Sequence, residues 1–341
     1  MAGLPISSGD PVVDRRGFII ALVPALLAVR LAAQAQQAGR VYRLGLLHPG
    51  ARSTAGTGLL ELVTVPMREL GYTEARNLVI EARFAEDKAD RLPELARELA
   101  QLKPDVILTI GTPAIRAAKE ATTTIPIVFL NNVDPVTAGL VASLARPGGN
   151  VTGMLITPEG TLGEKKLALL KEMVPKAKRI ARLTPDNAGG GINTQVQEVR
   201  KAAASLGLEL IVIEARGGDY AKAFSAISTA RPAALFVGAN SRFVRDRQQI
   251  IDLAAMYRLP AIYEWPRQVK DGGLMSYGAS DTETYRRVAS YVDRIFKGAT
   301  PSELPIEQPS KLLLVINLKA AKAMGLTVPQ SLLLRADEVI Q

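Results

Sequence analysis

Short apolar runs alternate along most of the chain with longer segments in which apolar residues recur at helical spacing. The runs 106–110 and 125–130 are rich in β-branched residues, as buried strands are. Segment 91–102 instead places Leu92 and Leu95 on one face of a helix. A parallel sheet whose strands are connected by helices produces this alternation. The pattern therefore predicts an α/β fold.

The alternation runs to about residue 156 and starts again after a crossing segment at 157–163. Strands are predicted at 41–47, 77–84, 106–110, 125–130, 151–155, 179–183, 209–213, 234–237, 261–263 and 273–277. Helices are predicted at 59–70 (kinked at Pro66), 91–102, 113–121, 135–144, 164–174, 193–206, 220–230, 243–257 and 282–296. Two successive α/β series predict two lobes, each with its own sheet, and a cleft between them.

The ends of the predicted strands are the place to look for a ligand. Ligands bind parallel sheets beyond the carboxyl ends of the strands, where loops and helix N-termini meet. These strand ends are polar or contain glycine in both predicted lobes. The candidate ligand-binding residues are His48, Gly50, Thr112, Asn132, Asp134, Asp186, Asn187, Asn240, Tyr263, Glu264, Trp265 and Tyr277.

Several candidates also have a purely structural interpretation. Asp134 precedes Pro135, so its carboxylate either caps a helix or meets a ligand amine. Tyr263, Glu264 and Trp265 either form a wall for an apolar ligand with a cationic end or pack against the hinge. The sequence leaves both pairs of alternatives open.

Composition removes several kinds of chemistry. The 341 residues contain no Cys and one His, which excludes thiolate chemistry and leaves any His-based catalysis to His48 alone. No G-x-S-x-G motif supplies a nucleophile for His48, so it contacts a ligand or has a structural role in its loop. The glycines at 189–191 match no phosphate-binding motif. We therefore predict no catalytic residue, no metal and no cofactor.

The net charge of +9 raises the question of a nucleic-acid partner. Lys and Arg are scattered among acidic residues, however, and no run of five or six basic residues occurs. This distribution is typical of a solvated surface. We predict no nucleic-acid partner.

Residues 14–35 have the three parts of a secretory signal. Arg15 and Arg16 precede an apolar stretch at 17–29, and small residues up to Ala35 provide an A-x-A cleavage site. The apolar stretch is shorter than the ~20 residues that a membrane span needs. The sequence predicts a cleaved signal peptide over 1–35 and a periplasmic mature protein. The paired arginines also fit the twin-arginine export route, and the choice between the two routes stays open.

Seven segments of the chain carry a resemblance to a known family. They are IPIVF at 125–129, DPV at 134–136, LVASLARPGGNVTG at 140–153, PAIYE at 260–264, GLMSYG at 273–278, VINLK at 315–319 and AMGLTVP at 323–329. The chain resembles the ABC transporter substrate-binding proteins related to binders of tryptophan and aromatic amino acids. It departs from the family pattern after the first strand, where His48 and the next two residues replace a frequent Asn or Ser.

The resemblance implies a type I periplasmic-binding-protein fold, in which two Rossmann-like lobes are joined by a three-stranded hinge. Lobe 1 is expected over 40–156 and 279–302, and lobe 2 over 157–278 and 303–341. Hinge rotation is expected near Thr157, Ser280 and Pro301. The resemblance also implies a partner, an ABC permease in the inner membrane that is powered by a separate ATPase.

The favoured function is capture of a small molecule for an ABC importer. Helix N-termini beside the cleft favour a carboxylate, which suits an amino acid or a small aromatic or branched acid. Two alternatives are a ligand-sensing protein without transport and an exported α/β enzyme. We find no constellation of a nucleophile, a base or a metal site that an enzyme would need. The ligand-sensing half of a transcription regulator would need a helix-turn-helix where the signal lies.

Overall fold

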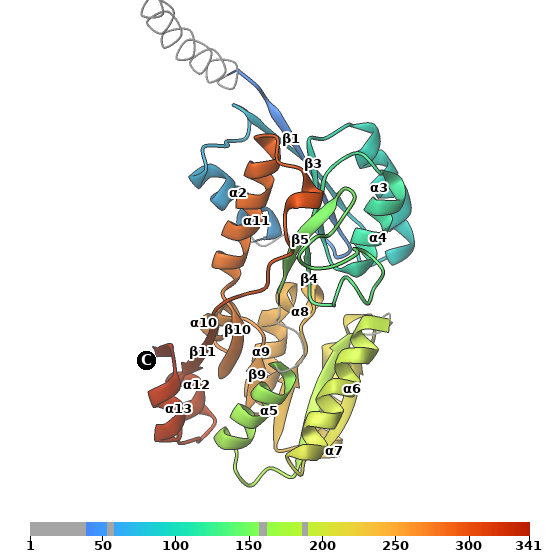
Figure 1. The fold of residues 1–341 in the computed structure, drawn as a ribbon. Helices are drawn as coiled ribbons and strands as arrows, with labels where there is room; N and C mark the ends of the chain where they lie inside the picture. The colour runs from blue at the N-terminus through green and yellow to red at the C-terminus, as the bar shows by residue number, and fades with distance from the viewer. Residues whose placement is uncertain (1–38, 53–57, 157–161, 186–189) are drawn as a thin grey trace, which may run out of the picture.

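The computed structural model describes residues 39–52, 58–156, 162–185 and 190–341, with side chains from residue 195 onward in the last range. These residues form two lobes, each built on one sheet with helices packed against it (Figure 1). The two-lobe α/β fold predicted from the sequence is confirmed. The predicted signal peptide, the hinge position Thr157 and the candidates Asp186 and Asn187 lie outside the described ranges.

Lobe 1 is built on a parallel sheet of five strands in the order β2-β1-β3-β4-β5. The strands are β1 (Tyr42–His48), β2 (Leu78–Phe84), β3 (Val106–Ile110), β4 (Ile127–Asn131) and β5 (Val151–Leu155). Helices α2 (Leu59–Glu69) and α11 (Asp281–Phe296) contribute to the core on one face, and α3 (Leu92–Gln101) and α4 (Thr112–Ala121) to the core on the other. Because both faces are covered, every residue of β3, β4 and β5 is buried, which explains their continuous apolar runs.

Lobe 2 is built on seven strands in the order β12-β11-β10-β9-β8-β6-β7. They are β6 (Arg179–Pro185), β7 (Glu209–Ala215), β8 (Ala234–Val237), β9 (Ala261–Tyr263), β10 (Met275–Ala279), β11 (Leu312–Asn317) and β12 (Glu338–Ile340). All neighbours are parallel except β10 and β11. One core contains residues of α5 (Leu162–Met173), α6 (Gly190–Ser205), α12 (Leu318–Ala323) and α13 (Gln330–Arg335). The other contains residues of α7 (Tyr220–Ala230), α8 (Ser241–Arg245) and α9 (Arg247–Met256).

The chain passes between the lobes three times. It leaves lobe 1 after β5, and it returns from β10 into α11, which lies beside α2 (Figure 1). Residues 304–307 still belong to lobe 1, because the Glu307 carbonyl accepts a hydrogen bond from Leu155 N at 2.8 Å and Ile306 is buried in a lobe 1 core. The chain then crosses again to reach β11.

Two predicted helices differ from the structure. Residues 135–140 form turns instead of the helix predicted over 135–144, because Gly139 has a left-handed φ of 69° and interrupts the helical path. The helix predicted over 243–257 is divided at Asp246 into α8 and α9. The elements α10 (Pro266–Lys270), β11, α12, α13 and β12 were not predicted.

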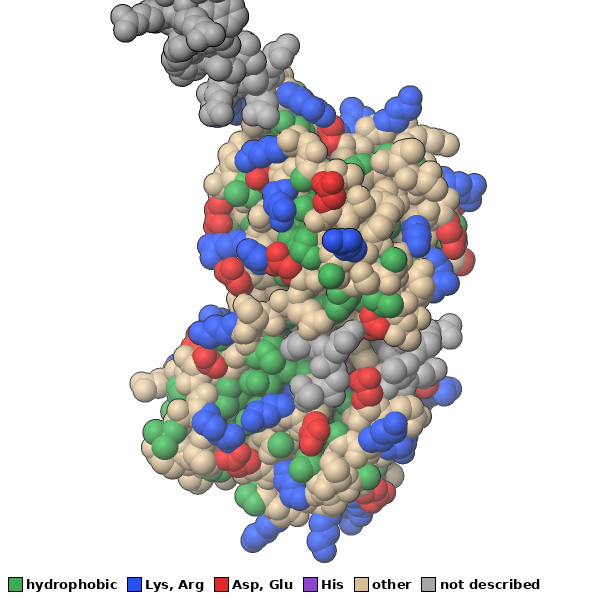
Figure 2. Space-filling model, in the orientation of Figure 1, with side chains coloured by type: hydrophobic (Ala, Val, Ile, Leu, Met, Phe, Trp, Pro, Cys, Tyr) green, Lys and Arg blue, Asp and Glu red, His purple; other side chains and the backbone are tan. Residues whose placement is uncertain are grey.

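The described residues contain no helix that is both long and apolar enough to cross a membrane. Within the same ranges, no group of three or more His, Asp and Glu side chains is placed to hold a metal ion. On the face shown in Figure 2, Lys and Arg side chains lie among Asp and Glu on both lobes.

Candidate functional site

A cavity of about 1200 Å³ lies between the two lobes. Lobe 1 contributes segments 48–52, 110–113 and 130–133, and lobe 2 contributes segment 239–242. These segments follow the carboxyl ends of parallel strands, as expected for a ligand site in this fold. The candidate residues that line the cavity are His48, Gly50, Thr112, Asn132, Asn240 and Trp265.

Thr112 begins helix α4 at the lobe 1 wall. Its hydroxyl donates to Oδ1 of the buried Asn131 at 3.2 Å, and Asn131 Nδ2 donates to the Val133 carbonyl at 2.9 Å. Gly111 has a φ of 82°, which glycine adopts without strain, and it turns the chain directly from β3 into α4. The N-terminus of this helix of ten residues therefore lies at the cavity, where its dipole favours a negative ligand group.

Asn132 connects the two lobes. Its Nδ2 donates to the Ala239 carbonyl at 3.3 Å, and Gln195 of α6 donates to the Asn132 carbonyl at 3.1 Å. The Oδ1 atom of Asn132 accepts no hydrogen bond from the described residues. Asn240, opposite, caps α8 by accepting a hydrogen bond from Arg242 N at 2.9 Å. Asn132 therefore keeps an acceptor free for a ligand, whereas the Asn240 oxygen is already used.

Asp134 does not line the cavity. Its carboxylate accepts hydrogen bonds from Val136 N at 2.9 Å and from Thr137 N at 3.0 Å, as well as from the Thr137 hydroxyl. Burial alone would raise the pKa of Asp134, but these hydrogen bonds outweigh it and lower the pKa. Asp134 thus caps a turn, which is the structural alternative that the sequence left open, and it lies outside the cavity lining.

Tyr263 and Tyr277 lie in the two cores of lobe 2 and do not line the cavity. Tyr263 is 1% exposed and packs in the core that α7, α8 and α9 cover. Tyr277 packs against the opposite core. Both rings therefore pack within lobe 2, and the structure does not bring them together with the candidates at the cavity.

Glu264 forms a buried ion pair with Lys166 of α5, and each side chain is 3% exposed. Arg182 of β6 lies nearby, with its guanidinium carbon 4.9 Å from the centre of the Phe236 ring. Burial lowers the pKa of Lys166 and lowers that of Arg182 to about 10, while the Glu264 carboxylate opposes both shifts. Glu264 therefore lies beside buried cations and outside the cavity lining, and the structure does not bring it together with the other candidates there.

Four arginines on the lobe 2 side of the cavity were missed in the sequence: Arg242, Arg245, Arg247 and Arg267. The first three follow Asn240 within seven residues, on the helices after β8. Their position just beyond a strand end is the feature of the sequence that could have identified them as cavity residues. Acidic partners hold several of these arginines, for example Asp281 at the start of α11, which lies 2.7 Å from Arg267.

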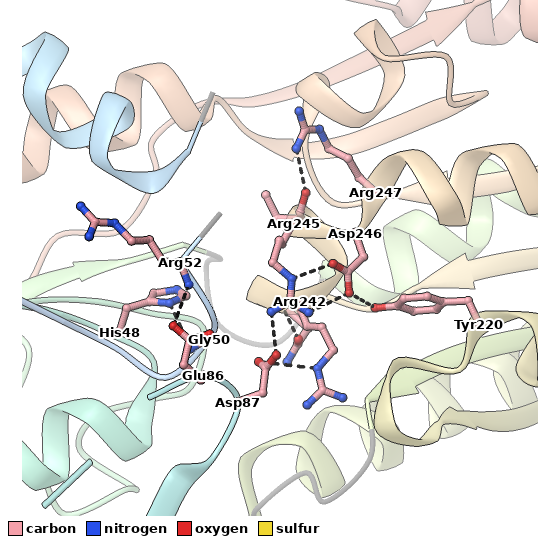
Figure 3. A network of polar contacts seen from close by, with 12 residues as sticks. His48, Gly50, Arg52, Glu86, Asp87, Tyr220, Arg242, Arg245, Asp246 and Arg247 are labelled. Carbon is pink, nitrogen blue, oxygen red and sulfur yellow. Dashed lines mark hydrogen bonds and ion pairs between the residues drawn. The ribbon is translucent and has the colours of Figure 1, made fainter. Parts of the chain in front are cut away.

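A network of ion pairs joins the lobes at the cavity edge (Figure 3). Asp87 of lobe 1 accepts a hydrogen bond from Arg245 Nη1 at 2.6 Å, and Arg242 Nε lies 3.6 Å from its other oxygen. Arg245 is also bound by both oxygens of Asp246, and Asp246 accepts a hydrogen bond from Tyr220 at 2.8 Å. Hydrogen bonds to Asp246 and Asp87 raise the pKa of Arg245, which keeps it charged.

Asp87 is held in a strained turn. Asp87 and Glu86 are consecutive non-glycine residues with left-handed φ angles of 60° and 54°, a conformation that costs about 1 kcal/mol or more per residue. Backbone hydrogen bonds from Glu86 N to the Gly50 carbonyl and from Asp87 N to the Pro49 carbonyl fix the turn. The turn therefore presents Asp87 to the opposite lobe.

We expect Asp87→Asn to favour separation of the lobes. Asn tolerates the left-handed conformation, so this variant removes the charge without adding strain. Loss of a partly exposed, hydrogen-bonded ion pair should cost the closed arrangement about 1–2 kcal/mol. Small-angle scattering of the ligand-free protein at low salt should show a larger radius of gyration than for the parent.

Asp90→Asn is the matched control, because Asp90 is an exposed acid in the same segment with no ion pair among the described residues. It should leave the radius of gyration unchanged. If the parent and Asp87→Asn have the same radius of gyration at low salt, Asp87 does not hold the lobes together.

His48 ends β1 at the lobe 1 wall and is 8% exposed. Its Nδ1 accepts a hydrogen bond from Gly50 N at 3.0 Å. Burial lowers the pKa of His48 to about 4, Arg245 acts in the same direction, and the charge of Asp87 opposes the shift. The imidazole is therefore neutral near pH 7.

Two α/β lobes with a cavity between them, lined by strand ends from both, are typical of a two-lobe solute-binding protein. The chain belongs to the ABC transporter substrate-binding protein family, whose model matches residues 48–340. The family resemblance found in the sequence is thereby confirmed.

Three relatives illustrate the match. A tyrosine-binding protein of Clostridioides difficile (strain R20291) is 26% identical over 262 residues, which cover 76% of this chain and 74% of that protein. A conserved domain protein of Vibrio cholerae is 26% identical with a TM-score of 0.77, over 88% of this chain and all of the other. An ABC domain from Streptococcus pneumonia in complex with L-Trp has the same coverage, a TM-score of 0.75 and 24% identity, and so supports the fold alone.

Proposed function

We propose that this protein binds an amino acid, or a small aromatic or branched carboxylic acid, between its lobes and delivers it to an ABC importer. The observation that carries the proposal is the cavity, whose lining includes Trp265, Asn132 and the N-terminus of α4. An indole provides apolar area, an amide oxygen suits an ammonium group, and a helix N-terminus suits a carboxylate.

The family and one relative support this choice of ligand. The family consists of substrate-binding proteins of ABC transporters, and the relative from Clostridioides difficile is a tyrosine-binding protein. The volume of about 1200 Å³ exceeds what one amino acid fills, so further closure of the lobes or ordered water would complete the fit. We propose export to the periplasm through the signal at residues 1–35, and binding without catalysis.

Trp265 provides a direct test, because it is the only Trp of the chain and lines the cavity. We expect a saturable change in intrinsic fluorescence when L-tyrosine, L-tryptophan, L-leucine or benzoate is added, with L-tryptophan read by calorimetry because it fluoresces itself. Native mass spectrometry of the purified protein should show a co-purified mass in this class.

Trp265→Phe is the control variant. It should abolish the fluorescence change while calorimetry still detects binding, since Phe keeps most of the apolar surface. If the parent binds none of the four probes and native mass spectrometry identifies a ligand of another class, such as a sugar, the proposed ligand class is wrong and the family assignment stands.

A further inference from the structure

His48 is the only histidine of the chain, and its hydrogen bond assigns its tautomer. A backbone N–H can only donate, so the bond from Gly50 N makes His48 Nδ1 an acceptor without a proton. A neutral imidazole then carries its proton on Nε2. His48 is therefore an Nε2–H donor.

The ring has little freedom to leave this position. A Cβ atom on Gly50 would lie 2.8 Å from His48 Cε1, so the backbone of Gly50 packs directly against the ring. The Phe84 ring lies on β2 with its centre 5.9 Å from that of His48. The His48 carbonyl accepts a hydrogen bond from Ala85 N at 2.9 Å, which ties the end of β1 to the strained turn. The donor direction is therefore fixed.

The Nε2 atom has no hydrogen-bond partner among the described residues. Four side chains in those residues have a fully buried polar atom without a partner, namely Thr109, Arg182, Glu264 and Ser276. The Nε2 atom of His48 is not among these atoms, so it is not fully enclosed. His48 borders the cavity between the lobes. An oriented donor without a protein partner is thus available to whatever occupies the cavity.

Charges of both signs lie around His48. Asp87 lies in the turn packed against its loop, and Arg245 reaches that turn from lobe 2. Glu86 and Arg52 lie beside the same loop, where Arg52 N donates to the Glu86 carboxylate at 3.3 Å. Burial is the largest influence on the pKa of His48, and the ring is neutral near pH 7. A neutral donor can discriminate among ligands by the hydrogen bond that it donates, because it lacks a positive charge that would attract every anion.

We propose that His48 is a specificity-determining residue, whose Nε2–H donates to a carboxylate oxygen of the ligand. This inference rests on the proposed function, because it needs a carboxylate ligand in the cavity. A bound ligand with a methyl or an ammonium group at that position would cover the donor and leave it unpaired, and sites of this kind reject such ligands strongly.

Having one histidine makes the test direct. In long-range proton–nitrogen NMR spectra of tag-free protein, the single imidazole should show the Nε2–H tautomer at pH 7. Adding the probe that changes Trp265 fluorescence should shift the Nε2 signal, because a charged acceptor now faces its proton. A charged imidazole or an Nδ1–H tautomer in the ligand-free protein would overturn the proposal.

Matched variants separate the donor from the shape of the side chain. His48→Gln keeps an N–H donor, whereas His48→Met keeps apolar bulk and has none. For the same probe, His48→Met should weaken binding by about ten- to hundredfold, and His48→Gln should recover most of that loss. Calorimetry measures both, and thermal unfolding confirms that the variants are folded.

The outcomes distinguish the two proposals. If a probe changes Trp265 fluorescence but leaves the Nε2 signal unmoved, or if His48→Met binds it like the parent, the role of His48 is wrong and the proposed function survives. If no probe binds and native mass spectrometry shows a ligand without a carboxylate, both proposals fail.

Discussion

Glu264→Gln is expected to lower the free energy of unfolding by about 3–5 kcal/mol, because it removes the acid that two buried cations share. Lys166 and Arg182 are 2% and 3% exposed, and Glu264 is the carboxylate that opposes the lowering of both pKa values. The Gln amide has nearly the same shape as the Glu carboxylate, so the lost unfolding free energy reports the removed charge and not a change in side-chain volume. Urea unfolding at pH 7, followed by circular dichroism, measures it.

Two comparisons sharpen this prediction. Lys166→Met should cost less than Glu264→Gln, since Arg182 remains to compensate Glu264. Glu338→Gln is the matched control, because its pair with Lys270 is about half exposed, and should cost less than about 1 kcal/mol. If Glu264→Gln unfolds like the parent but loses ligand binding, Glu264 contacts the ligand as the sequence first suggested.

Acidification is expected to remove about 3 kcal/mol of stability through His48 alone. Burial lowers its pKa from the ordinary value of 6.5 to about 4 in the folded protein, so the unfolded chain takes up this proton first. The contribution is complete above about pH 6.5 and is lost as the pH falls towards 4. Asp87 and Arg245, the charged groups that face the ring, act on its pKa in opposite directions.

The variant His48→Gln isolates this effect from the titration of carboxylates. The difference in unfolding free energy between the parent and His48→Gln should shrink by about 3 kcal/mol between pH 7 and pH 4. Urea unfolding at intervals of half a pH unit gives the two curves. Parallel curves would show that His48 titrates near its ordinary value and is less buried than described.

The sequence predicted the elements that are buried on both faces. Strands such as β3 and β4 are apolar at almost every position because helices cover both sides of the sheet, and a continuous apolar run shows this directly. Their polar ends could therefore be assigned to the cleft. Thr112 and Asn132 line the cavity for this reason.

The roles after β9 could not be predicted. β9 has three residues, all buried, so no alternation shows which face each following side chain meets. Glu264 turns to Lys166, whereas Trp265, one residue later, reaches the cavity. Pairs across the cleft leave no local signal either, because Asp87 and Arg245 are 158 residues apart in sequence.

The three crossings of the chain have a consequence for the order of folding. Helix α11 supplies Tyr285, Val292 and Phe296 to the core of lobe 1, where the Phe296 ring stacks on Tyr42 with centroids 4.4 Å apart. The sheet of lobe 2 is completed only by β11 and β12, close to the C-terminus. Neither lobe has all of its core until synthesis is nearly finished. Because contacts this distant in sequence form slowly, the nascent chain should stay largely unfolded until its synthesis is nearly complete.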